Sequence, residues 1–315
     1  MLAALVAAFF ASGLGAIQST PHDLVASLPT FGKLPTKQYA GYANATADGH
    51  NRLFCAPRPL QRRAAAPPHV VGPSLYSTSG GISCADWFVE CVDCGNRSNE
   101  EIPLVLWLNG GPGASSITGL LIEKLGPLMI SKNGTLVANP DHITKKHHLL
   151  VIDNPVGSGY STTDNGAYVH SETQVRTQFV HALHQFFNWH PEYRDSPFWV
   201  TGESYAGHYV PNIAWEIAVN ATDIKLQGIV VGNGMYNMKL QYNTLGKIAF
   251  ANGLIDPPIL AKLEARQDSC IRGIDADPGH EGAYCENVTV RWLYSRDGPA
   301  GESPSKRRFR REPSP

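Results

Sequence analysis

Continuous apolar runs of strand length recur along the chain between residues 103 and 233. There are four of them: PLVLWL (103–108), HLLVID (148–153), FWVT (198–201) and LQGIVVGN (226–233). Apolar runs without polar alternation are typical of strands that are covered on both faces, as in parallel sheets. The pattern therefore predicts four buried strands in one sheet.

Helix-favouring stretches fill the intervals between these runs. Helices are predicted from about residue 114 to 125 and from about 205 to 219. A third helix is predicted after Ser171 and Gln174, which form a capping box. The apolar residues that follow this box recur on one helical face: Val175, Phe179, Leu183 and Phe186. The alternation of strands and helices predicts an α/β fold, with a mostly parallel central sheet flanked by helices.

Glycine-rich segments directly follow three of the predicted strands. They are NGGPG (109–113), DNPVGSGYS (153–161) and GESYAG (202–207). In α/β sheets, ligands bind in the loops at the carboxyl ends of the strands. We therefore expect these three loops to meet at one edge of the sheet and to form a site there.

The segment GESYAG matches the G-x-S-x-G pattern, in which a sharp turn from strand to helix exposes a nucleophilic serine. Ser204 is the predicted nucleophile. The backbone N–H groups of Tyr205 and of Gly111 in the NGGPG loop are predicted to form an oxyanion hole, which acyl transfer requires. The alternatives are a serine that only caps a helix and a glycine loop that is only a tight turn.

Three motifs, in the order of the chain, resemble those of the serine carboxypeptidase family of α/β-hydrolases. They are WLNGGPGASS (107–116), DNPVGSGYS (153–161) and GESYAGHYVP (202–211), and GIVVGNG (228–234) is also similar. The resemblance covers roughly residues 31–54 and 87–294. One departure is Ala114, where the family usually has a cysteine.

The resemblance implies a peptidase that releases C-terminal amino acids through an acyl-enzyme on Ser204, without a cofactor or a metal. It also implies a set of residues that bind the free carboxylate of the substrate: Trp107, Asn109, Gly110, Glu123 and Glu203. Glu203 can donate a hydrogen bond to a carboxylate only when it is protonated. Because neighbouring carboxyls raise the pKa of one of them, we expect a peptidase that favours acidic pH.

A serine nucleophile needs a histidine and an aspartate, which follow the serine in the order Ser, Asp, His on this fold. No such pair is identified in this chain, which ends 111 residues after Ser204 (315 − 204). Asp256 and His280 have the right order but lie in a helical and an irregular segment, and His208 resembles a structural position. Residues 252–260 resemble the start of the family's helical insertion. We therefore expect a hydrolase fold that is incomplete at its C-terminus and an activity that is in doubt.

Four segments of different composition divide the chain. Residues 1–15 form an apolar run of signal-peptide length, and residues 16–294 form a partial α/β-hydrolase domain. Residues 55–86 lack periodicity and are rich in Pro, Ala, Gly and Ser, and we interpret them as an irregular insertion that interrupts one strand, such as a translated intron. Residues 295–315 form a basic, Pro/Ser-rich tail that we expect to be disordered.

The overall charge of the chain is close to neutral. A net charge of −1 with 17% charged residues excludes bulk electrostatic binding of nucleic acid, and after residue 15 no apolar run is long enough to span a membrane. Cys91 and Cys94 form a CxxC motif, for which a structural disulfide is favoured. A metal or redox site would be considered in a cytosolic chain, but no second CxxC completes a zinc site.

Five N-x-S/T sequons point to the secretory pathway, with the vacuole or lysosome and the extracellular space as destinations. Their asparagines are Asn44, Asn96, Asn133, Asn220 and Asn287. The six cysteines suit the same oxidising route. The expected partners are peptide or protein C-termini.

Two other functions are compatible with the same residues. One is a family acyltransferase, which would use Ser204 to pass an acyl group to an alcohol. The other is a binding protein or fragment without catalysis, which the missing histidine and aspartate favour. Glu203 together with Asn109 favours a substrate with a free carboxylate, and therefore the peptidase.

Overall fold

The computed structural model separates the chain into two compact units, Met1–Gly234 and Met235–Pro315. The residues that the structure describes are 23–28, 30–46, 51–53, 86–163, 166–242 and 244–276. The predicted signal peptide, the basic tail, His280 and Asn287 lie outside the described residues, as do residues 55–85 of the insertion.

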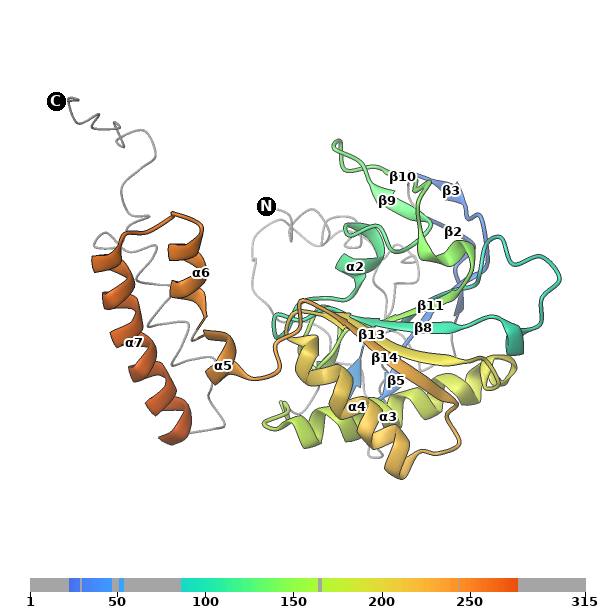
Figure 1. The fold of residues 1–315 in the computed structure, drawn as a ribbon. Coiled ribbons are helices and arrows are strands. Elements are labelled where there is room, and N and C mark those ends of the chain that lie inside the picture. Colours follow the sequence, from blue (N-terminus) through green and yellow to red (C-terminus); the bar gives the residue numbers. More distant parts are fainter. Residues whose placement is uncertain are drawn as a thin grey trace, which may run out of the picture. The chain divides into compact units, whose positions relative to one another are not determined.

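A seven-stranded mixed sheet forms the centre of the larger unit (Figure 1). Its strand order is β1 (Asp23–Leu24), β4 (Gln38–Gly41), β7 (Asp86–Val89), β11 (His148–Ile152), β8 (Leu104–Leu108), β13 (Phe198–Glu203) and β14 (Leu226–Gly232). The last four are parallel and the first three pair antiparallel. The four parallel strands are those that the apolar runs predict.

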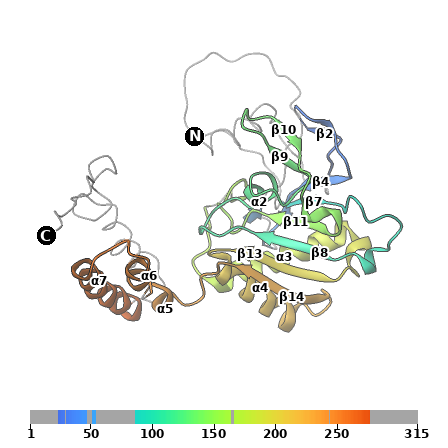
Figure 2. The same cartoon turned by 45° about the horizontal axis from the view of Figure 1, so that its top comes forward.

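Three helices cover this sheet, and Figures 1 and 2 show them on opposite faces. One face carries α3 (Glu172–Trp189) and α4 (Ala206–Asn220), and the other carries α2 (Ile117–Leu121). Successive residues of a strand point to opposite faces. Accordingly, Leu150 packs in the core with α3 and α4, whereas Leu149 and Val151 pack in the core with α2.

Helix α3 begins as the sequence predicts. The Ser171 side chain accepts a hydrogen bond from Gln174 N (3.3 Å), while the Gln174 side chain accepts one from His170 N (2.7 Å) in place of Ser171 N. All four residues of the predicted apolar face are buried. They pack on the sheet, and this burial holds α3 there.

Short elements complete the larger unit. The small strands are β2 (Ser27–Leu28) with β3 (Gly32–Lys33), β9 (Leu128–Ile130) with β10 (Leu136–Ala138), and β6 (Asn51–Leu53) between β5 (Ala43–Asn44) and β12 (Thr162–Thr163). The 3-10 helices are η1 (Asn99–Glu101), η2 (Ile143–Lys145) and η3 (Pro191–Tyr193).

The strands on either side of the insertion pair with one continuous stretch of chain. Along residues 38–44, Asp86 lies opposite Gly41 and Leu53 lies opposite Ala43. Gly41 and Ala43 are two residues apart in the chain. Their partners Asp86 and Leu53 would also be two residues apart if Asp86 directly followed Phe54 in a single strand. Asp86 therefore belongs to β7, whereas the sequence pattern predicted it to be the last residue of the insertion.

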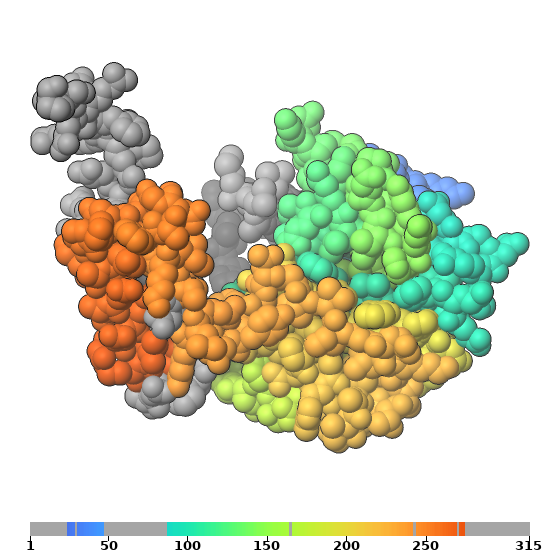
Figure 3. Space-filling view, viewed as in Figure 1, coloured from blue at the N-terminus to red at the C-terminus, as the bar shows by residue number. Residues whose placement is uncertain are grey.

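Strand β14 differs from the prediction of a buried strand. It is the last strand of the sheet, and Ile229 and Val230 are 45% and 56% exposed. Trp215 and Val219 of the adjacent α4 are also exposed. The gold and orange side chains of this region lie on the face of the larger unit that Figure 3 shows. An apolar run predicts that a segment is a strand. Whether that strand lies inside the sheet or at its edge depends on which neighbouring strands are present.

The smaller unit is helical where it is described. It contains α5 (Met238–Tyr242), α6 (Leu245–Ala251) and α7 (Pro257–Ala276), as expected for the start of a helical insertion. Asp256 caps α7 by accepting a hydrogen bond from Ile259 N (2.9 Å). Within the described part of the chain, no helix combines the length and apolarity that crossing a membrane requires.

Candidate active site

Ser204 lies in the turn that joins β13 to α4. Its backbone φ is 57°, in the left-handed region that non-glycine residues seldom occupy. Ser204 N donates a hydrogen bond to Gly232 O, and Ser204 O accepts one from Gly207 N, both at 3.0 Å. A serine held in this conformation between a strand and a helix is the turn that the G-x-S-x-G pattern predicts.

Gly202 allows the neighbouring elements to approach this turn closely. A Cβ atom at Gly202 would lie 2.5 Å from Leu108 O and 2.6 Å from Ala206 Cβ. Any larger residue would therefore push β8 and α4 away from β13. The first glycine of the pattern is therefore required by packing.

The NGGPG loop lies directly against the serine turn. A Cβ atom at Gly110 would clash with Tyr205 N and would lie 2.8 Å from Glu203 O. Gly111 has a φ of 111°, which favours glycine, and Gly110 O accepts a hydrogen bond from Ala114 N (3.1 Å). The structure thus brings together the two loops in which the oxyanion-hole residues are predicted.

The Asn109 side chain is buried at the centre of the predicted carboxylate site. Its Oδ1 atom accepts hydrogen bonds from Trp107 Nε1 (2.9 Å) and Gly119 N (3.2 Å). These bonds orient its Nδ2 atom, which donates to Glu123 Oε1 (2.8 Å) and Glu203 Oε1 (3.1 Å). The structure therefore assembles four of the five predicted carboxylate-binding residues through one amide, and Gly110 follows Asn109 directly.

The two carboxyls that share this amide influence each other. Desolvation by burial raises the pKa of Glu123, the hydrogen bond from Asn109 opposes the rise, and the charge of Glu203 and a hydrogen bond with it add to it. A raised pKa on one member is expected when two carboxyls share a site. This rise occurs at Glu123, and the protonation of Glu203 stays a prediction.

Asp153 connects the glycine loops, a role that the sequence reasoning missed. Its buried carboxylate accepts hydrogen bonds from Ser115 Oγ (2.7 Å), Ser116 N (2.7 Å) and Tyr160 N (3.0 Å). Ser116 Oγ in turn accepts a hydrogen bond from Asn109 N (3.2 Å). Burial raises the pKa of Asp153 to about 6, although these hydrogen bonds oppose the rise. The only sequence signal was an aspartate at the end of a buried strand, before a glycine loop.

A polar cluster lies beside the serine turn. Tyr205 donates a hydrogen bond from its hydroxyl to Glu172 Oε1 (3.1 Å), and its ring stacks on His208 with 4.7 Å between the ring centres. Burial raises the pKa of Glu172, and hydrogen bonding to Tyr205 opposes this. His208 thus packs against the residue that follows the nucleophile, as expected for a structural position.

A histidine and an aspartate for Ser204 are not found among the described residues. In that part of the chain, no imidazole forms a hydrogen bond with Ser204 Oγ. Asp256 is occupied as the cap of α7 in the smaller unit, and His280 lies outside the described residues. Nor do three His, Cys, Asp or Glu side chains of the described ranges gather as a metal site.

Parallel strands, a serine turn between strand and helix, and a glycine loop packed on that turn together define an α/β-hydrolase. Among solved structures, the fold is similar to that of a prohormone-processing carboxypeptidase from Saccharomyces cerevisiae. The TM-score is 0.59 at 25% sequence identity, and the match covers 80% of this chain and 51% of that chain.

The family model for serine carboxypeptidases matches residues 87–292, and the chain belongs to this family. It is 37% identical to the lysosomal protective protein of Mus musculus over 216 residues, which are 65% of this chain and 44% of the relative. It is 30% identical to a pheromone-processing carboxypeptidase of Metarhizium robertsii over 301 residues, which are 92% of this chain and 43% of the relative. The chain thus spans less than half the length of these relatives.

Proposed function

We propose that this chain carries the nucleophile and the carboxylate-binding half of a serine carboxypeptidase, which releases C-terminal amino acids from peptides. The observation that carries the proposal is the Asn109 amide, held beside the serine turn and bonded to both Glu123 and Glu203. Both N–H groups of this amide are directed at the two carboxyls, so a proton retained by the carboxyl pair is the donor that can bind a carboxylate without a lysine or an arginine.

The proposed reaction proceeds through an ester on Ser204. Its Oγ attacks the carbonyl carbon of the last peptide bond, and the N–H groups of Gly111 and Tyr205 stabilise the oxyanion that forms. The C–N bond then breaks as the leaving nitrogen takes up a proton, and the amino acid departs, after which water hydrolyses the ester and restores the Ser204 hydroxyl. A base must accept the Ser204 proton, and we assign that step to none of the described residues.

Two measurements on the whole chain test this proposal. A fluorophosphonate probe should label Ser204 if the site is active, and Ser204→Ala should abolish the label. A peptide acid should bind at least tenfold more tightly than the same peptide with a C-terminal amide, because the amide cannot use the carboxylate site. Equal binding of the acid and the amide would contradict the proposed carboxylate site.

The absence of an imidazole bonded to Ser204 among the described residues supports a second function. In this case the chain binds peptide C-termini without cleaving them. The same experiment separates the two functions, because a binding protein would prefer the peptide acid but would leave the probe unreacted. Transfer of the acyl group to an added alcohol would instead identify an acyltransferase.

We also propose that the protein enters the secretory pathway. The predicted signal peptide and sequons support this, and a similar protein from Mus musculus is named lysosomal. Asn96 and Asn133 are exposed, as glycan attachment requires. Asn44 fits less well, because its side-chain oxygen is buried in β5.

A further inference from the structure

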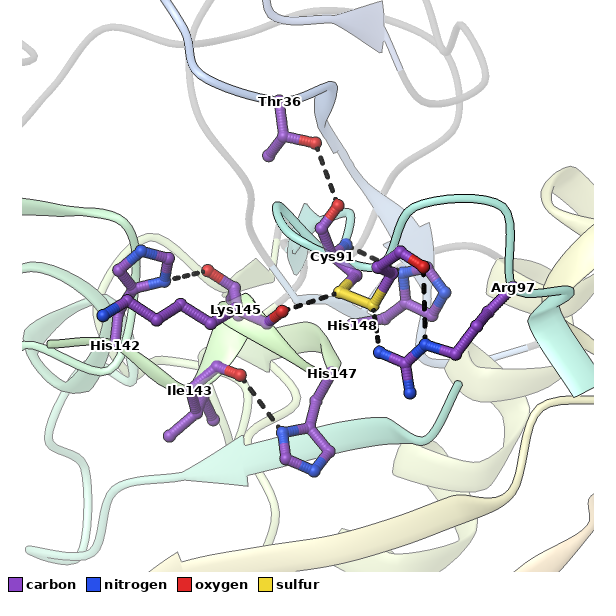
Figure 4. The surroundings of a disulfide bond; sticks show 10 residues. Thr36, Cys91, Arg97, His142, Ile143, Lys145, His147 and His148 are labelled. Carbon is purple, nitrogen blue, oxygen red and sulfur yellow. Dashed lines mark hydrogen bonds between the residues drawn. A yellow bond between two sulfur atoms is a disulfide. The ribbon is translucent and has the colours of Figure 1, made fainter. Parts of the chain in front are cut away.

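A disulfide joins Cys91 and Cys94 in the connection between β7 and η1 (Figure 4). The CxxC motif was predicted to form a structural disulfide, and the bridge itself is confirmed. However, it encloses only four residues, and a disulfide that closes so short a loop restricts the unfolded chain far less than one that closes a long loop. Stabilisation of the fold is therefore a weak explanation for it.

A guanidinium group lies against one of the two sulfur atoms. Arg97 Nη2 is 2.9 Å from Cys94 Sγ, and Arg97 Nε donates to Cys94 O (3.4 Å). Within the described part of the chain, Arg97 forms no ion pair with a carboxylate. A neighbouring cation favours the thiolate form of a cysteine, so Arg97 would stabilise negative charge on Cys94 if the disulfide opened.

The other charged groups around the disulfide do not cancel this effect. His148 accepts a hydrogen bond from Cys91 N at its Nδ1 atom (3.1 Å), so the ring is neutral. Lys145 places its backbone oxygen 3.4 Å from Cys91 Sγ, and its ammonium pairs with Asp141. Asp93, the acid within the motif, is exposed, as is Arg97, and solvent screens both charges, but of the two only Arg97 contacts a cysteine sulfur directly.

The two cysteines also differ in burial. Cys94 is 8% exposed, whereas Cys91 is only partly buried. Cys91 is therefore the residue of the pair that is more accessible to a reagent from solution. This leaves Cys94, the residue in contact with the arginine, as the leaving group.

We propose that the Cys91–Cys94 disulfide is a reversible thiol–disulfide exchange site, at which Arg97 stabilises the leaving Cys94 thiolate. The co-reactant is a small thiol of the glutathione class. The thiolate of this small molecule attacks Cys91 Sγ. The bond between Cys91 Sγ and Cys94 Sγ breaks, and the electron pair of that bond moves to Cys94 Sγ. A second thiolate then attacks the sulfur of the small molecule, which releases Cys91 as a thiolate that takes up a proton. Two small thiols are thereby oxidised to one disulfide, and the protein disulfide is reduced.

Reduction kinetics of the whole chain test this proposal. The chain is incubated with reduced glutathione and alkylated at intervals, and peptide mass spectrometry follows Cys91 and Cys94. We expect Arg97→Gln to slow opening about tenfold, because the leaving thiolate loses its cation, and Arg97→Lys to restore most of the rate. Arg272→Gln, at an exposed arginine of α7, is the control and should leave the rate unchanged. Equal rates for the wild type and Arg97→Gln would overturn the proposal.

Single-cysteine variants provide a second test that does not depend on the rate of disulfide opening. In Cys91→Ser, alkylation of the free Cys94 should reach half its maximal rate at a lower pH than in the double variant Cys91→Ser/Arg97→Gln, because Arg97 stabilises the Cys94 thiolate. Equal pH profiles for these two variants would contradict the proposal. Circular dichroism of each variant shows whether the fold is retained.

Discussion

At the scale of the residue, the raised pKa of Glu123 gives the proposed site its pH dependence. Because burial and the neighbouring Glu203 raise this pKa above its usual 4.5, the pair keeps a proton to a higher pH than an isolated glutamate does. That proton is the one that a substrate carboxylate needs. Binding should therefore be strongest at low pH and weaken as the pH rises through the raised pKa.

This leads to a prediction for Glu203→Gln, whose amide supplies an N–H group that does not titrate. The affinity of the wild type for a peptide acid should fall about tenfold per pH unit once the pH exceeds the raised pKa of Glu123, because one favourable proton is lost. The variant should change by less than about twofold over the same range. Calorimetric titration at several pH values measures this. The control is Glu100→Gln, at an exposed glutamate of η1, which should keep the wild-type dependence of affinity on pH. The same dependence in Glu203→Gln would contradict the proposed role of the carboxyl proton in binding.

Asp153 gives a prediction about stability. Its pKa is raised from 3.8 to about 6 in the folded chain, so the folded state binds the proton more tightly than the unfolded state does. The stabilisation from this proton is complete below pH 3.8 and is lost as the pH rises to about 6, a change of about 3 kcal/mol in the free energy of unfolding.

Asp153→Asn should remove this dependence on pH. Asp153→Asn should also lower the free energy of unfolding at pH 7 by about 1–3 kcal/mol. The reason is that the new side-chain NH₂ group would face the hydroxyl and N–H donors that bind the Asp153 carboxylate. Urea unfolding followed by tryptophan fluorescence measures both effects. Asp195→Asn, at a half-exposed aspartate, is the control. An unchanged pH profile in Asp153→Asn would show that another group titrates.

The residues of the site differ in how far the sequence reveals them. Ser204, Gly111 and Tyr205 occupy fixed positions in a motif, so local pattern is sufficient to name them. Asp153 acts across the fold, on Ser116 and Tyr160, and no local pattern encodes that contact. Its role became visible only when the distances between the loops were known.

At the scale of the element, the four parallel strands were predictable because their apolar runs are continuous. The helix predicted over residues 114–125 is shorter, Ile117–Leu121. Its start is displaced because Ser115 and Ser116 bind Asp153. Its end is displaced because Lys124 adopts a φ of 67°, which a helix cannot contain.

The pairing of β6 and β7 yields a prediction for the insertion. Removal of residues 55–85 joins Phe54 to Asp86 and keeps the observed register, so we expect a stable protein with an unchanged or higher melting temperature. Removal of residues 55–86 shifts β7 by one residue and directs its buried side chains to the wrong faces. Thermal melts of the two variants should therefore differ by several degrees or more. Equal melting temperatures would contradict a single interrupted strand.

At the scale of the whole molecule, the exposed edge at β14 dominates the expected behaviour of the isolated chain. Unpaired strand edges with apolar side chains promote association. This surface carries Ile229 and Val230, and Trp215 and Val219 of α4 are exposed beside it. The chain should therefore associate in solution as its concentration rises.

A charge at this edge should reduce the association. We expect Val230→Lys to increase the monomer fraction severalfold in light scattering coupled to size exclusion, because lysine opposes edge-to-edge pairing. Tyr168→Lys is the control and should leave the monomer fraction unchanged, since Tyr168 is 53% exposed in the loop before α3 and lies in no edge strand. A wild-type chain that stays monomeric at high concentration would refute the prediction.

The conformation of Ser204 limits which residues can serve at the tip of the turn. A φ of 57° is tolerated by an unbranched side chain but disfavours one that branches at Cβ. Threonine has the same hydroxyl chemistry, yet it does not suit this backbone. For the nucleophile proposed at position 204, cysteine is therefore the replacement that suits this backbone and still carries a reactive atom, so the main-chain conformation limits which nucleophiles this turn can present.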